Sequence, residues 1–207
     1  MEDNGNMTAE RSLEIIRDMI ERSKNTMVKQ SAAPLIWWGL LVAVFALVIN
    51  FLWKHYNDPG WNLLWFVMGV VGYIGNRVID KRRESTPKTF VNETVGQVWC
   101  TFGIFCAAIG FTACFIGMGV LPKEIIAPDG HLALNMTSII TLCLGIASTI
   151  TGFILHNRII LVCGIIAGIG GFFGAMRFPE EQMYVMAAVA IVGLVIPGLL
   201  ITVQNKK

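Results

Sequence analysis

Long apolar runs without any charge alternate along the chain with short polar segments. Asp, Glu, Lys and Arg are absent from six windows, namely residues 30–53, 59–76, 94–122, 130–157, 159–176 and 182–205. Each window has at least 18 residues, the length that a helix needs to cross the hydrocarbon core of a bilayer. The pattern predicts an all-α, polytopic membrane protein with six transmembrane helices.

The six spans are expected to form one bundle over residues 31–203. They are placed at about 34–53, 61–79, 95–120, 136–155, 159–176 and 183–203. Pro34 falls in the first turn of the first span, where a missing N–H costs little. Pro197 falls inside the sixth span and is expected to kink it, because the carbonyl of Gly193 loses its helical donor.

Residues 1–30 are predicted to form a polar tail followed by an amphipathic helix. Apolar residues recur along this helix at spacings of three, four and seven, which places them on one face. This candidate contact stripe consists of Leu13, Ile16, Ile20 and Met27. Three interpretations stay open: the helix lies in the plane of the lipid headgroups, packs against this protein or a second copy, or binds a cytoplasmic protein partner.

The composition supports a membrane protein, since 55% of the 207 residues are hydrophobic and only 14% are charged. Disordered chains and ordinary soluble domains contain far more charge. Thirteen of the 16 Lys and Arg residues lie before span one, after spans two and four, or in the tail 204–207. Because Lys and Arg near span ends stay on the cytoplasmic side, both termini and the amphipathic helix are expected to be cytoplasmic.

A basic cluster follows the second span and is expected to contact anionic lipid headgroups, which attract cations near a span end. Its residues are Arg77, Lys81, Arg82 and Arg83. Nucleic-acid binding would need a broader basic surface or an aromatic stacking platform. The sequence has neither, so no nucleic-acid partner is expected.

Small residues are frequent in the fourth and fifth spans. In a bilayer, such residues let two helix backbones approach closely, and this approach drives helix packing. The predicted packing residues of the fifth span are Gly164, Gly168, Gly170 and Gly174. We therefore expect spans four and five to make the tightest contact of the bundle, with a flexible helix along a substrate path as the alternative.

Charges are absent from the middle of every span, which argues against proton-coupled transport and against channels with charged rings. A path for a neutral molecule is still compatible with the sequence. The polar side chains that could line its cavity are Gln97, Thr101, Thr112, Thr141 and Thr151. Hydrogen bonds between helices, or from Thr to its own helix, are the alternative role of these residues.

Catalytic and metal-binding patterns are missing from the sequence. His55, His131 and His156 lie in three separate loops, and no HExxH motif is present. The five cysteines all lie in apolar windows without CxxC spacing, and we interpret them as packing residues that remain thiols. We expect no enzyme activity, no cofactor and no metal.

The N-terminal segment joins the amphipathic stretch LEIIRDMIERSK to the span LIWWGLLVAVFAL. In this it resembles uncharacterised small bacterial six-span inner-membrane proteins with an N-terminal amphipathic helix. The resemblance covers roughly the first 53 residues. It implies a bacterial inner membrane and a sensor or accessory role with a cytoplasmic partner, and it implies no catalytic residues.

These features together predict a non-enzymatic membrane protein with a regulatory or accessory role, acting through contacts between helices. The expected partners are the lipid bilayer, a second copy of the chain or a cytoplasmic protein. The alternative function is a transporter or pore for an uncharged or amphipathic small molecule.

Overall fold

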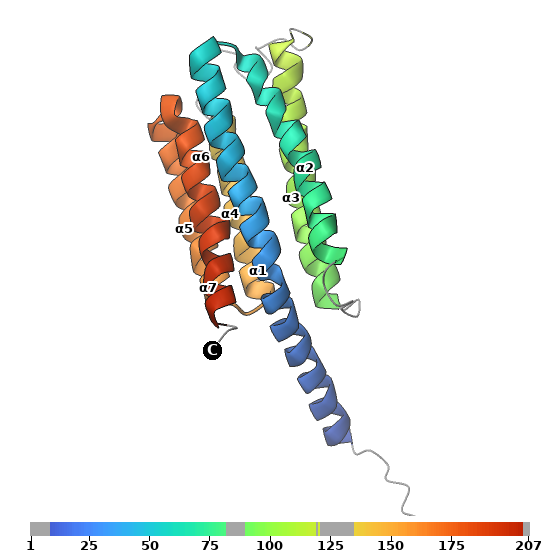
Figure 1. Ribbon diagram of the computed structural model, residues 1–207. Coiled ribbons are helices and arrows are strands. Elements are labelled where there is room, and N and C mark those ends of the chain that lie inside the picture. The colour runs from blue at the N-terminus through green and yellow to red at the C-terminus, as the bar shows by residue number, and fades with distance from the viewer. Residues whose placement is uncertain (1–8, 82–89, 119, 121–134, 205–207) are drawn as a thin grey trace, which may run out of the picture.

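The computed structural model describes residues 9–81, 90–118, 120 and 135–204, and all regular structure in these ranges is helical (Figure 1). Helix η4 is π-helical, whereas η1 and η3 are short 3-10 turns. The elements are α1 (Ala9–Tyr56), η1 (Pro59–Leu63), α2 (Leu64–Lys81), α3 (Phe90–Gly117), α4 (Met136–Ile154), α5 (Arg158–Arg177), η3 (Pro179–Glu181), α6 (Gln182–Ala190), η4 (Ile191–Val195) and α7 (Ile196–Gln204).

Within the described residues, six helical segments are long and apolar enough to cross a membrane, as the sequence predicts. They are Arg11–Tyr56, Gly60–Lys81, Glu93–Ile116, Met136–Ile154, Arg158–Arg177 and Pro179–Gln204. Their outward surfaces carry large exposed apolar side chains such as Val70, Ile104, Phe105 and Phe173. A continuous apolar surface of this kind is unfavourable in water and suits a lipid environment.

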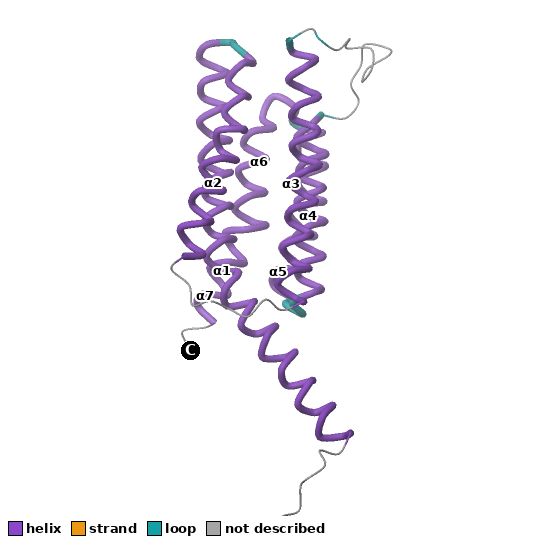
Figure 2. The backbone as a smooth tube through the Cα atoms, turned by 90° about the vertical axis from the view of Figure 1, so that its right-hand side faces the viewer, coloured by secondary structure: helices purple, strands orange, loops and turns teal. Residues whose placement is uncertain are grey.

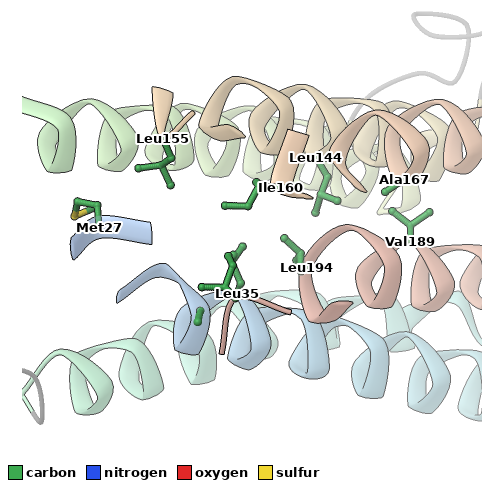
Figure 3. Packing of buried hydrophobic residues seen from close by; sticks show 10 residues of the cluster. Met27, Leu35, Leu144, Leu155, Ile160, Ala167, Val189 and Leu194 are labelled. Carbon is green, nitrogen blue, oxygen red and sulfur yellow. The ribbon is translucent and has the colours of Figure 1, made fainter. Parts of the chain in front are cut away.

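Helices α1, α4, α5 and α6–η4–α7 form the closely packed part of the bundle (Figures 1 and 2). Leu144 and Ile160 from α4 and α5 point toward Leu35 and Leu194 from α1 and η4 in its core (Figure 3). Helices α2 and α3 lie outside this group: Gly72 is the one buried residue of α2, and no described side chain of α3 is buried. The rings of Phe66 and Phe111 join α2 to α3, with centroids 5.0 Å apart.

Helix α1 runs without a break through Pro34. The prediction of a first helix ending near residue 30 and a separate span beginning at Pro34 is therefore wrong. Proline removes one backbone hydrogen bond from a helix interior, which normally breaks or kinks it. Here the buried residues Ala32 and Leu35 on either side of Pro34 pack on the bundle core and favour the continuous helix.

The kink predicted at Pro197 coincides with an irregular segment. The N–H of Ile196 donates to the carbonyl of Ile191, five residues back, instead of four. Such π-helical turns are one of the identified causes of helix bending. The sixth span therefore consists of two short α-helices, α6 and α7, joined by η4.

The N-terminal part of α1 extends well beyond the ends of the other helices (Figures 1 and 2). We call residues 9–26 the stalk, because Met27 is the first residue of α1, among those whose side chains the structure describes, that is buried in the core. A helix of this length spans about 27 Å. We call the end of the bundle from which it projects the stalk end, and the opposite one the far end.

Candidate functional site

The stalk presents apolar side chains that are exposed. Leu13, Ile16 and Ile20 are 66%, 53% and 48% exposed, and Ile15 and Met19 beside them are also exposed. The structure thus brings three of the four predicted stripe residues together on the stalk. Met27, the fourth, is only 9% exposed and belongs to the core.

The middle of helix α1 contacts the irregular part of the sixth span. A Cβ atom on Gly39 would lie 2.7 Å from Val195 Cγ2 and 2.9 Å from Leu194 Cβ. One on Gly198 would lie 2.9 Å from the carbonyl oxygen of Ala32. Glycine at both positions therefore lets α1 touch η4 and α7 at backbone distance.

This contact makes α1 a direct connection between two parts of the molecule. One end of the helix carries the exposed face of the stalk, and its middle rests on η4, where backbone hydrogen bonding departs from α-helical spacing. π-Helical turns frequently occur at functional sites. We take the stalk and the α1–η4–α7 contact together as the candidate functional site.

Helices α4 and α5 make the most extensive contact of any described pair, as the sequence predicts. A Cβ atom on Gly168 would lie 2.8 Å from Gly145 Cα, and one on Gly164 would lie 2.8 Å from the backbone nitrogen of Thr149. Gly174 is less crowded, with Val185 Cγ1 at 3.3 Å from the Cβ position. These three predicted positions face neighbouring helices.

Gly170 does not pack as predicted. In the described part of the chain, no atom outside its own local backbone lies within 4 Å of the Cβ position of Gly170. Gly171 faces the interior instead, where its Cβ would lie 2.5 Å from Val189 Cγ2 and 2.9 Å from Thr141 Cβ. Adjacent glycines differ by about 100° around a helix, so the spacing alone left the choice between them open.

The tryptophans near the start of the first span pack α1 against α2. The ring of Trp38 fills the space beside Gly72, and that of Trp37 fills the space beside Gly75. Trp37 Nε1 also donates a hydrogen bond to the carbonyl oxygen of Gly72 at 3.2 Å. Gly72 and Gly75 allow these large rings to approach the backbone of α2.

The five polar residues predicted to line a cavity do not come together. Gln97 and Thr101 are exposed on α3, and Thr112 Oγ1 donates to the carbonyl oxygen of Ala108 in the same helix at 2.9 Å. Thr141 and Thr151 are buried and donate to carbonyls of α4 at 2.9 and 2.8 Å. The geometry thus matches the alternative in which Thr bonds its own helix.

Of the predicted headgroup contacts, Arg77 and Lys81 lie exposed near the C-terminal end of α2, whereas Arg82 and Arg83 lie outside the described residues. Arg77 donates from Nε and Nη2 to Tyr73 Oη at 3.0 and 2.8 Å. Its guanidinium also lies over the Tyr73 ring, 5.3 Å from the centroid. This tyrosine orients Arg77 along α2.

A group of polar contacts at the far end was not predicted. Asn135 Nδ2 donates to the carbonyl oxygen of Ala175 at 2.6 Å, and Asn135 Oδ1 accepts from the Ser138 backbone N–H at 2.7 Å. Thr137 Oγ1 donates to Gln182 Oε1 at 2.7 Å, which joins α4 to α6. The signal for the contact of Asn135 with the Ser138 N–H was present in the sequence, because Asn directly before an apolar helix is a preferred N-cap.

An ion pair links α1 to the start of the sixth span at the same end. Lys54 Nζ lies 3.6 Å from Glu181 Oε1, and both side chains are about half exposed. Lys54 Nζ also lies 5.2 Å from the centroid of the Tyr184 ring. Exposed pairs of this kind contribute little stability.

The described histidines lie apart, and the cysteines form no disulfide. His55 and His156 are exposed at opposite ends of the bundle, and His131 lies outside the described residues. The five cysteines are unpaired thiols. Within the ranges that the structure describes, no group of three His, Cys, Asp or Glu side chains is placed to hold a metal ion.

Comparison of the chain with known protein families, with curated proteins and with solved structures gave no match.

Proposed function

We propose that this protein is a non-enzymatic component of the bacterial inner membrane that has a regulatory or accessory role and acts through contacts between helices. In this proposal the protein crosses the membrane six times, and the stalk and both termini are cytoplasmic. The cation distribution supports this orientation, since thirteen of the 16 Lys and Arg residues fall on one side. On that side, Arg77, Lys81, Arg82 and Arg83 contact anionic headgroups.

The continuity of α1 carries this proposal. A contact made by the stalk changes the position of α1, and α1 touches η4 at Gly39 and α7 near Ala32. Because η4 already departs from α-helical hydrogen bonding, it is the part of the core that rearranges most easily. The stalk is thus the part that receives a contact, and the sixth span is the part whose structure changes in response.

Amide hydrogen exchange on the full chain in lipid nanodiscs tests this proposal. The double variant Ile16→Glu and Ile20→Glu abolishes the apolar contact of the stalk and leaves the bundle core intact. We expect faster exchange in residues 191–204 and unchanged exchange in the α4–α5 contact. The control is Glu14→Gln with Asp18→Asn, which alters the opposite face of the stalk. Identical exchange in the double variant and the natural protein would contradict the proposal.

Transport of an uncharged molecule is the second candidate. The buried irregular backbone of η4 beside Pro197 favours it, because transporters build substrate sites where transmembrane helices are interrupted. The exposure of Gln97 and Thr101 on α3 gives it no support. Uptake of small neutral solutes into vesicles of the purified protein distinguishes the two candidates, and selective uptake would favour transport.

A further inference from the structure

The apolar face of the stalk is broad. At about 100° per residue, Leu13, Ile16 and Ile20 form one side of this face, and Ile15 and Met19 form the other. All five side chains are between 41% and 66% exposed. A seam between two helices needs only a narrow stripe, whereas a helix that lies on a surface presents a wide face.

The acidic residues of the stalk whose side chains the structure describes form a row on the opposite side. Glu14, Asp18 and Glu21 follow one another at spacings of four and three, and all three are exposed. By helical geometry, the centre of this row lies about 180° from the centre of the apolar face. The carboxylates are therefore as far from the apolar face as the helix allows.

The arginines lie between these two faces. Arg17 borders the apolar face on one side, and Arg11 and Arg22 lie on the other side, next to the acidic row; all three are exposed. Arginine side chains are long enough to extend their guanidinium groups past the border of an apolar face. The described arginines of the stalk thus lie close to the apolar face, and the described carboxylates lie farther from it.

This arrangement matches an anionic membrane surface. The acyl boundary receives the apolar side chains, the lipid phosphates receive the arginines at both borders, and the carboxylates face water. A second copy fits less well: in a seam centred on Leu13, Ile16 and Ile20, the flanking positions carry Arg17 and Met19. Neither a parallel nor an antiparallel pair would then place a carboxylate opposite Arg17.

A place where α1 can bend lies between the stalk and the bundle. Thr26 Oγ1 donates to the carbonyl oxygen of Arg22 at 2.9 Å, and hydrogen bonds of this kind often bend helices. The next residue, Met27, is fixed in the core. The stalk extends away from the bundle in the structure (Figure 1), so binding a flat surface requires a change of direction at this place.

We propose that the stalk binds an anionic lipid surface beside the bundle, with its apolar face toward the acyl chains. This inference rests on the proposed function, because it names the partner whose contact with the stalk starts the proposed response. Lipid charge then sets the direction of the stalk relative to the bundle.

Cysteine labelling of the full chain tests the inference. The five native cysteines are replaced with Ala, and a single cysteine is introduced by Ile16→Cys on the apolar face or by Asp18→Cys on the acidic row. Each protein is placed in nanodiscs of phosphatidylcholine alone or of equal parts phosphatidylcholine and phosphatidylglycerol. We expect a membrane-impermeant maleimide to label position 16 about tenfold more slowly in the anionic discs. Labelling of position 18 should be the same in both.

Charge variants identify the cause of any protection. Changing Arg11, Arg17 and Arg22 together to Gln should weaken the binding of the stalk to the anionic lipid surface about 100-fold, since each basic residue contributes roughly fivefold. This change should restore fast labelling of position 16. Glu14→Gln with Glu21→Gln is the matched control and should keep the protection. Both sets lie on the exposed stalk, so the folding of the bundle is not affected.

Two results would overturn the inference. Equal labelling of position 16 in both lipids shows that lipid charge has no role. Protection that persists in detergent together with crosslinks between two copies identifies a second copy as the partner. Neither result affects the proposed function if the Glu substitutions at Ile16 and Ile20 still change exchange in η4. Conversely, lipid-dependent labelling without any change in η4 refutes only the proposed function.

Discussion

Gly168 and Gly170 lie two residues apart in α5 and have opposite surroundings. A Cβ on Gly168 would lie 2.8 Å from Gly145 Cα, whereas no described neighbour lies within 4 Å of the same position on Gly170. The difference shows why a count of small residues does not define a packing face. The direction of each residue relative to the neighbouring helix decides its role.

Alanine at these two positions is expected to have opposite effects. Gly168→Ala should lower the free energy of unfolding by about 1–3 kcal/mol, because the backbone of α4 cannot yield without separating from α5. Gly170→Ala should be neutral or stabilising by up to about 1 kcal/mol, since Ala favours a helix and meets open space. Unfolding of the detergent-purified variants in SDS measures both. Equal effects of the two substitutions would contradict the packing described for α4 and α5.

Asn135 and Glu181 provide a second contrast between single residues. Asn135 caps α4 and reaches the carbonyl oxygen of Ala175, so Asn135→Ala should cost about 1–3 kcal/mol of unfolding free energy. Glu181→Gln removes an exposed ion pair with Lys54 and should cost less than about 1 kcal/mol. The same unfolding assay compares the two losses of unfolding free energy. A larger loss from Glu181→Gln than from Asn135→Ala would contradict the role given to Asn135 at the far end.

Among the elements, the spans are the part that the sequence predicts best. The predicted span 136–155 corresponds to α4 (Met136–Ile154), and 159–176 corresponds to α5 (Arg158–Arg177). Charge is excluded from a bilayer core, so charged residues can mark the ends of apolar helices, as Arg158 and Arg177 do for α5. The kink predicted from Pro197 likewise coincides with the irregular segment η4 of the sixth span.

The continuity of α1 was not predictable from local rules, because proline normally ends or kinks a helix. Packing of Ala32 and Leu35 on the core outweighs the lost hydrogen bond, and such packing depends on residues far away in the sequence. The same limitation applies to the candidate site. The stripe on the stalk follows from spacing alone, whereas the contacts of Gly39 and Gly198 depend on how two distant helices cross.

The contact between α1 and η4 is tested by the substitution Gly39→Val. The new side chain would collide with Leu194 and Val195, so we expect lower stability by about 1–3 kcal/mol and faster amide exchange in residues 191–198. Gly69→Val in α2 is the control, because the Cβ position of Gly69 has no described neighbour within 4 Å. Unchanged exchange in residues 191–198 of the Gly39 variant would show that the contact with α1 does not affect the backbone of the sixth span.

The whole molecule combines a closely packed group of helices with two peripheral ones. α1 is the only described helix that both extends outside the bundle and contacts its core. Helices α2 and α3 present large apolar side chains outward, which in a membrane are covered by lipid. Under the proposed function, a signal received at the stalk would reach the sixth span without passing through α2 or α3.

The proposed function requires that the chain crosses a membrane six times with the stalk in the cytoplasm. Reporter fusions in bacterial cells test it most directly, with a fluorescent protein that matures only in the cytoplasm and an enzyme that is active only outside it. We expect cytoplasmic signals from fusions before Met1 and after Lys207, and an external signal from a fusion in the loop between α1 and α2. An external signal after Lys207 would contradict the account, because it requires an odd number of crossings or the reverse orientation.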